Sequence, residues 1–131
     1  ISQSKKIAFT GMIDNVPSFL LDADICVFTS IAEASPTAIW EALSMGKAIV
    51  TTDVGSVNQY IEDGISGFIV PVKDVEALCG KVEILLENSD LRNKMGIEAR
   101  SIAKRYLDIS IAAEKHATIY RKILSESSPI T

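Results

Sequence analysis

Two glutamates eight residues apart, Glu33 and Glu41, are the side chains of this sequence best placed to do chemistry. They bracket a Ser-Pro turn and the first turns of a predicted helix, directly after a short apolar run typical of a buried strand. Carboxylates accept hydrogen bonds from sugar hydroxyls, and each charge-assisted bond contributes roughly 1.5–3 kcal/mol. Because helical side chains lean toward the helix N-terminus, we expect the Glu41 carboxylate to approach the same pocket as Glu33.

The backbone between the two glutamates predicts an anion site. Ser35 is suited to cap the helix, and Pro36 to occupy its first position, where no N–H donor is needed. The amides of Thr37 and Ala38 would then be free at the positive end of the helix dipole, where phosphate groups bind. Amides for phosphate beside carboxylates for hydroxyls suit a nucleotide sugar.

The same residues also allow a purely structural interpretation. Glu33 near a helix start would stabilise the helix by about 0.3–1 kcal/mol. Glu41 would belong to a solvated face with Thr37 and Ser44. The apolar face of this helix is made by Ile39, Ala42, Leu43 and Met45. The strand that precedes the helix, and a second loop of similar kind at residues 52–56, favour the binding site.

Composition limits the classes of protein to consider. The chain has 131 residues, enough for one domain with a core, and its 47% hydrophobic and 23% charged residues are ordinary for a globular protein. The formal net charge is −4 and no basic stripe is present, so we expect no nucleic-acid partner. No apolar run has the length of a membrane span, and no signal peptide is visible.

The two cysteines indicate a reducing compartment. Cys26 falls in a predicted strand and Cys79 in a predicted helix, and neither has metal-ligand partners nearby. We therefore expect both to be small apolar residues of the core.

Strand and helix patterns alternate regularly through residue 88, which predicts an α/β fold with a parallel sheet and flanking helices. The expected strands are residues 7–10, 25–29, 48–51 and 67–70, and the expected helices between and after them are 17–22, 36–45, 56–61 and 74–88. Ligands of such sheets bind beyond the carboxyl ends of the strands. We expect the loops that follow these strands, residues 11–15, 30–36, 52–56 and 70–74, to open onto one edge.

Several helix ends and faces are also predicted. Gly46 is expected at the C′ position of one helix, Asp74 as the cap of another, and Ser89 with Asp90 as the cap of a third that runs to about residue 106. A last helix is expected from about residue 108. Phe19 should point inward, as should the apolar face formed by Val75, Leu78, Val82, Leu85 and Leu86.

The motifs together resemble a known family. They are residues 9–11, 23–30, 46–55 and 62–71, with Glu33 and Glu41 between them. In this order they resemble the C-terminal, donor-binding half of a GT-B glycosyltransferase of the retaining type called family 4, or glycosyl transferases group 1. The resemblance implies a Rossmann-like domain over residues 1–124, truncated at its N-terminus, with C-terminal helices and a frayed tail at 125–131.

The resemblance also implies roles for individual residues. Glu33 matches a glutamate that binds the donor-sugar hydroxyls near the reacting carbon, which makes it the candidate catalytic residue. Glu41 matches the glutamate that binds the ribose hydroxyls, the turn from Ala34 to Ala38 holds the sugar and the distal phosphate, and the base rests on Gly11 and Met12. Members move a hexose from a nucleotide diphosphate sugar with retention, without a metal or cofactor. A helix N-terminus can stabilise the leaving diphosphate in place of a cation.

The resemblance implies a partner as well. The family's N-terminal domain supplies the acceptor site, and this chain begins with Ile1 rather than Met, so we expect it to be a piece of a longer polypeptide. Alone it should bind donor weakly and transfer nothing. An open apolar sheet edge such as residues 7–10 should promote self-association. The complete protein is expected to take part in polysaccharide or glycoconjugate biosynthesis, in the cytoplasm or peripherally at the membrane.

Three other functions compete with this one. A phosphoacceptor receiver domain shares the length and an acid after the third strand, Asp53, but it needs an acidic pair after the first strand, where residues 9–12 offer none. A glycoside hydrolase needs its carboxyls ~5 Å or ~6.5–9.5 Å apart across a cleft, whereas Glu33 and Glu41 flank one helix start. A non-catalytic nucleotide-sugar-binding module stays open.

Overall fold

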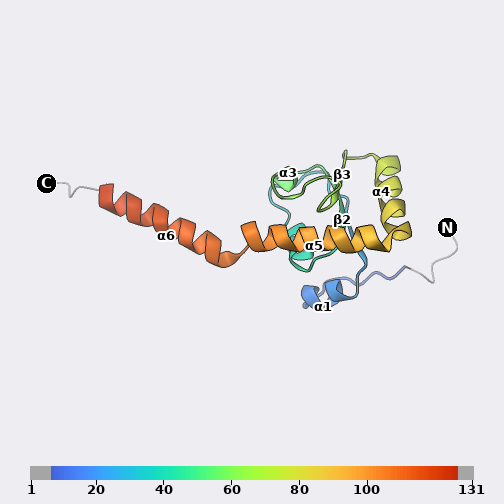
Figure 1. Cartoon of the computed structure of the whole chain (residues 1–131), viewed down its shortest axis with the longest axis horizontal. Coiled ribbons are helices and arrows are strands. Elements are labelled where there is room, and N and C mark those ends of the chain that lie inside the picture. Colours follow the sequence, from blue (N-terminus) through green and yellow to red (C-terminus); the bar gives the residue numbers. More distant parts are fainter. Residues whose placement is uncertain (1–6, 127–131) are drawn as a thin grey trace.

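The computed structural model describes residues 7–126 and contains a three-stranded parallel sheet (Figure 1). Its strands are β1 (Ile25–Phe28), β2 (Ala48–Thr52) and β3 (Phe68–Val70), in the spatial order β1-β2-β3. Cys26 pairs with Ile49, and Thr51 with Ile69. All five residues of the central strand are buried. The predicted α/β fold with a parallel sheet is confirmed.

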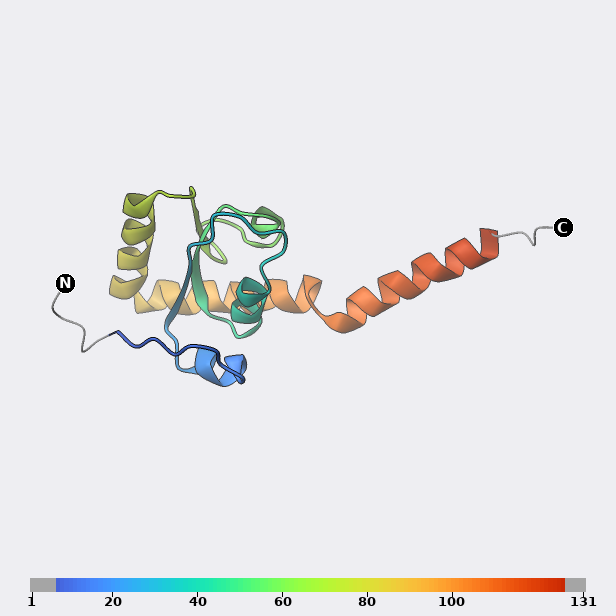
Figure 2. The same ribbon diagram turned by 180° about the vertical axis from the view of Figure 1, so that it is seen from behind.

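Six helices accompany the sheet in the described part of the chain: α1 (Val16–Leu21), α2 (Thr37–Ser44), α3 (Val57–Tyr60), α4 (Val75–Glu87), α5 (Ser89–Tyr106) and α6 (Ile109–Glu126). Seen from both sides, α5 crosses the body and α6 projects away from it (Figures 1 and 2). None of the helices in the described range is long and apolar enough to cross a membrane.

The alternation of side chains along β2 divides the core into two clusters. Ile49 packs in one cluster with side chains of α2, α3 and α5, whereas Ala48 and Val50 pack in the other with α4 and the first half of α5. Successive strand residues point to opposite faces, so an unbroken apolar strand needs cover on both. Helix α5 serves both clusters, through Met95 on one and Ala99 on the other.

Helix α2 ends at the glycine that the sequence indicated. Gly46 has φ +66°, its N–H donates to Leu43 O at 2.9 Å, and the Lys47 N–H donates to Ala42 O at 3.1 Å. This pair of bonds is the Schellman arrangement, which satisfies the last carbonyls of a helix. The predicted C′ position of Gly46 is confirmed. Helix α5 packs closely against Gly46, since a Cβ built on Gly96 of α5 would collide with the Gly46 carbonyl.

Residues 7–10 do not form the predicted strand. The side chains of Ile7 and Phe9 are exposed, Phe9 to 98%. A strand needs a neighbour for its N–H and C=O groups, and none of the described strands pairs with this segment. Residues 7–10 therefore do not provide the open sheet edge on which self-association was expected. The sheet ends in β1 and β3 instead.

Two amphipathic faces are narrower than their sequence pattern indicated. Phe19 is 51% exposed, and Leu20 is the buried residue of α1. On α4, Leu85 is buried, whereas Val75 and Leu86 are exposed. The prediction that all these side chains point inward is wrong, because only one stripe of each short helix meets the rest of the body.

The helix caps confirm one expectation and correct another. Asp74 caps α4 as predicted, its Oδ1 accepting from the Ala77 N–H at 2.9 Å. The cap of α5 is Asn88 rather than Ser89 or Asp90, since Asn88 Oδ1 accepts from the backbone N–H three residues on at 2.9 Å. An Asn at this point competes with the Ser that follows it, and both are good caps.

The cysteines differ from each other. Cys26 is buried in β1 as expected, whereas Cys79 is exposed on α4, so its prediction as a core residue is wrong. Burial raises the pKa of the Cys26 thiol, and the Lys47 ammonium opposes this shift. The two cysteines were given the same prediction, but their surroundings in the structure differ.

Helix α6 has no buried residue. At its start, the Ser110 hydroxyl and N–H donate to Asp108 Oδ1 at 2.6 and 2.8 Å, which lowers the pKa of the Asp108 carboxyl. The helix continues through Glu126, and residues 127–131 of the predicted frayed tail lie outside the described residues.

Candidate functional site

The loops that follow β1, β2 and β3 lie at one edge of the sheet, because the three strands are parallel. The first two loops are in direct contact. The Ser56 N–H donates to Ala34 O at 3.2 Å, and a Cβ built on Gly55 would lie 2.5 Å from Ala34 O and 2.6 Å from Glu33 O. Gly55 also has φ +54°, a conformation that side chains other than glycine adopt only with strain. Only glycine allows the two loops to fit together at this point.

Two hydrogen bonds in series connect the Glu33 carboxylate to the end of the central strand β2. The Ser30 hydroxyl donates to Glu33 Oε1 at 2.9 Å, and the Thr52 hydroxyl donates to Ser30 O at 2.7 Å. Thr52 is buried, whereas Glu33 is exposed, so the carboxylate is oriented by the protein and open to a ligand. Sequence reasoning missed Ser30 and Thr52. Their position directly at the carboxyl ends of two strands was the signal that could have found them.

The start of α2 differs from the prediction by one residue. The helix begins at Thr37 with Pro36 as its N-cap, so Ser35 is not the N-cap and Pro36 is not the first helical residue. Ser35 does not cap because its Oγ accepts a hydrogen bond from Trp40 Nε1 at 3.0 Å. A helix boundary of this kind is decided by which partner the side chain finds.

The amides at this helix start are free all the same. The Pro36 carbonyl accepts from the N–H groups of Ile39 and Trp40, at 3.1 and 3.4 Å. The N–H groups of Thr37 and Ala38 have no hydrogen-bond partner among residues 7–126. Two free donors at the positive end of a helix are what an anion such as phosphate requires.

Glu41 lies one turn further along α2 and lines a cavity of about 630 Å³. The cavity is shared with Thr37 and Trp40 of the same helix, and its other walls come from α1 and from the junction of α5 with α6. Glu33 is not among its lining residues. Glu41 therefore lines the same cavity as Thr37 at the helix start, whereas Glu33 contacts the loop after β2. In the sequence, the two glutamates lie on either side of the same turn.

Gly11 and Met12 lie in an exposed segment before α1. Met12 is 96% exposed, and no atom lies within 4 Å of the position that a Cβ on Gly11 would occupy. In the described residues, no hydrogen bond joins this pair to the turn at 33–41. Their assignment to the nucleotide base stays a prediction.

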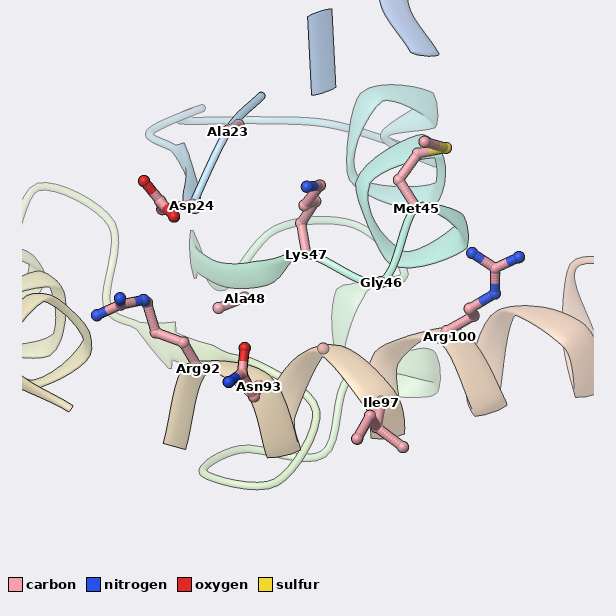
Figure 3. A pocket seen from close by; sticks show the side chains of 11 residues that line it. Ala23, Asp24, Met45, Gly46, Lys47, Ala48, Arg92, Asn93, Ile97 and Arg100 are labelled. Carbon is pink, nitrogen blue, oxygen red and sulfur yellow. The ribbon is translucent and has the colours of Figure 1, made fainter. Parts of the chain in front are cut away.

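A second cavity, of about 450 Å³, lies at the opposite edge of the sheet (Figure 3). Asp24 and Lys47, which line it, immediately precede β1 and β2, so it opens at the amino ends of the strands. Two of its cations are bonded to the backbone: Lys47 Nζ donates to Leu21 O at 2.9 Å, and Arg92 donates to carbonyls at the end of α4. Over residues 7–126, no group of three or more His, Cys, Asp or Glu side chains is placed to hold a metal ion.

Comparison with known proteins identifies the class. The family described as glycosyl transferases group 1 matches residues 2–102, so the chain belongs to this family. Among curated relatives, an alpha-D-kanosaminyltransferase of Streptomyces kanamyceticus is 31% identical over 120 residues, which is 90% of this chain and 31% of the relative. An N,N'-diacetylbacillosaminyl-diphospho-undecaprenol alpha-1,3-N-acetylgalactosaminyltransferase of Campylobacter jejuni is 28% identical over 92% of this chain and 32% of its own length. The chain thus spans about a third of these relatives.

Solved structures agree on the fold. A glycosyltransferase from Rickettsia africae superposes with a TM-score of 0.87 at 28% identity, covering 94% of this chain and 33% of that one. The Anabaena protein Alr3699/HepE, solved in complex with UDP-glucose, superposes with a TM-score of 0.85 at 21% identity, covering 91% of this chain and 33% of its own. The predicted membership of the GT-B C-terminal half is confirmed.

Proposed function

We propose that this chain is the donor-binding part of a retaining, metal-independent glycosyltransferase that moves a hexose from a nucleotide diphosphate sugar to an acceptor. The observation that carries the proposal is the pair of free amides at the start of α2, one turn from Glu41 and anchored to the carboxyl edge of the sheet. Two relatives that are sugar transferases by name, and the UDP-glucose complex of HepE, support it. The acceptor site would belong to an N-terminal domain outside this chain.

Each part of the site would recognise one part of the donor. The amides of Thr37 and Ala38 would bind the diphosphate, Glu41 would accept from the ribose hydroxyls, and Glu33 from the sugar hydroxyls. Gly11 and Met12 would support the base. Carboxylates match hydroxyls because they only accept hydrogen bonds, and backbone amides match phosphate because they only donate.

The same arrangement suits transfer with loss of a diphosphate. As the bond between the anomeric carbon and the phosphate oxygen breaks, negative charge grows on the leaving group and positive charge on the sugar ring. The helix N-terminus stabilises the former, and a carboxylate at the position of Glu33 stabilises the latter. Because Ser30 and Thr52 hold Glu33 in place before the reaction, little reorganisation is needed.

Calorimetric titration tests the two glutamates separately. A panel of nucleoside diphosphates and the corresponding nucleotide sugars is titrated into the complete protein. Glu41→Ala should weaken binding of both kinds of ligand by about 1.5–3 kcal/mol, because both carry the ribose. Glu33→Ala should weaken the nucleotide sugars by a similar amount and leave the diphosphates unchanged.

A matched control is Glu98→Ala, which removes an exposed glutamate of α5 that lines neither cavity. It should bind every ligand like the unaltered protein. If none of the nucleotides binds, or if Glu33→Ala and Glu41→Ala behave like the control, the proposed donor site is wrong.

A further inference from the structure

Trp40 connects the candidate phosphate-binding turn to the body of the protein. Its indole Nε1 donates to Ser35 Oγ at 3.0 Å, although Ser35 lies outside the helix and Trp40 inside it. The Trp40 ring also lines the cavity that contains Thr37 and Glu41. One side chain therefore contacts the turn before the helix start and forms part of the wall of the cavity behind it.

The ring is itself held by two further aromatic side chains. The Tyr60 ring of α3 meets the Trp40 ring edge to face, with centroids 5.1 Å apart and planes at 72°. The Tyr106 ring of α5 meets Tyr60 in the same manner at 6.1 Å and 62°. Edge-to-face pairs of this kind stabilise the relative placement of the two rings. The indole is thus anchored to α3 and α5, and its N–H has a defined direction.

The direction of this hydrogen bond decides what the Ser35 hydroxyl can do. An indole N–H only donates, so Ser35 Oγ must be the acceptor. Its own proton then points elsewhere, and Ser35 is an exposed residue with no acceptor for that proton in the described range. Accepting one hydrogen bond also makes a hydroxyl a better donor of the next. Ser35, which directly precedes the turn residue Pro36 and the free amides of Thr37 and Ala38 in the sequence, is therefore prepared to donate to an incoming acceptor.

We propose that Trp40 is a positioning residue of the donor site: it orients the Ser35 hydroxyl so that this hydroxyl donates to a phosphate oxygen of the nucleotide diphosphate. The inference rests on the proposed function and adds a side-chain donor to the two backbone donors. Trp40 itself acts through Ser35. Tyr60 contributes by fixing the plane of the indole.

A double-mutant cycle isolates the proposed interaction. Ser35→Ala removes the hydroxyl, and Trp40→Phe keeps an aromatic ring against Tyr60 but removes the N–H. For whichever of UDP, GDP and ADP binds the unaltered protein, Ser35→Ala should weaken binding about tenfold and Trp40→Phe about fivefold. The double variant should bind no more weakly than Ser35→Ala, because the N–H acts only through the hydroxyl.

Four measurements separate this role from a general loss of structure. The nucleoside without phosphates should bind all four proteins equally, Ser35→Thr should restore diphosphate binding, and Tyr106→Phe, which keeps its ring, should have no effect. Trp40 is the chain's single tryptophan, so its emission should change when the diphosphate binds, and change less in Ser35→Ala.

The outcomes distinguish the two proposals. If no nucleotide binds the unaltered protein, the proposed function fails, and this inference with it. If a diphosphate binds but the two single variants are unaffected, or if their effects add, only the positioning role of Trp40 is overturned. The same holds if the nucleoside loses as much affinity as the diphosphate.

Discussion

Replacing Gly55 with alanine would disturb the contact on which the candidate site is built. The new Cβ would lie 2.5 Å from Ala34 O and 2.6 Å from Glu33 O, distances that Cβ atoms do not tolerate. The left-handed backbone at φ +54° adds about 1–2 kcal/mol of strain for any residue except glycine. Relief of the clash by a backbone shift adds about 1–3 kcal/mol, so we expect a total loss of about 2–5 kcal/mol in the free energy of unfolding.

Gly64→Ala is the matched control for this substitution. Gly64 also has a positive φ, +80°, but no atom lies within 4 Å of its Cβ position. It should therefore lose only the conformational part, about 1–2 kcal/mol. Urea unfolding of both variants gives the contribution of the clash as the difference between them. Because the atoms that must move belong to Glu33 and Ala34, Gly55→Ala should also weaken nucleotide-sugar binding in calorimetry, and Gly64→Ala should not.

Equal stability of the two variants, together with unchanged ligand binding by Gly55→Ala, would refute the reasoning. It would mean that the loop after β2 can move away from the loop after β1 without consequence. The two loops would then not define one site.

Three further experiments test the fold. Gly96→Ala should lower the free energy of unfolding by about 1–3 kcal/mol, because its Cβ would meet the Gly46 carbonyl and separate α5 from the end of α2. Gly80→Ala, in open space on α4, should instead stabilise the protein by about 0.5–1 kcal/mol. Urea unfolding that ranks the two variants in the reverse order would contradict the packing of α5 on α2. Iodoacetamide should label Cys79 in the folded protein and Cys26 only after unfolding, as mass spectrometry would reveal. The raised pKa of Cys26 means that its neutral thiol favours the folded state at neutral pH, and this contribution is lost as the pH rises through the raised pKa; unfolding of Cys26→Ala should lack that alkaline decline.

Local features of this protein could be predicted from the sequence because their physics is local. Gly46 ends α2 since only glycine adopts a positive φ without strain, and Asp74 caps α4 since its carboxylate reaches an amide three residues away. The alternation of apolar strands and amphipathic helices was enough for the parallel sheet, and therefore for the common edge of its loops. Thr37 and Ala38 were identified as free donors from the Ser-Pro turn alone.

The tertiary structure decided whatever depends on a partner distant in the sequence. Residues 7–10 have the composition of a strand, yet a strand exists only where another strand pairs with it. Ser35 is a residue type that commonly caps helices, yet its Oγ accepts a hydrogen bond from the Trp40 indole, whose ring packs against Tyr60 of α3. The tie from Thr52 through Ser30 to Glu33 joins the ends of two strands that are neighbours only after folding. A hydrogen bond or a close contact requires two groups to lie next to each other. The sequence shows which groups are available, and the tertiary structure determines which of them meet.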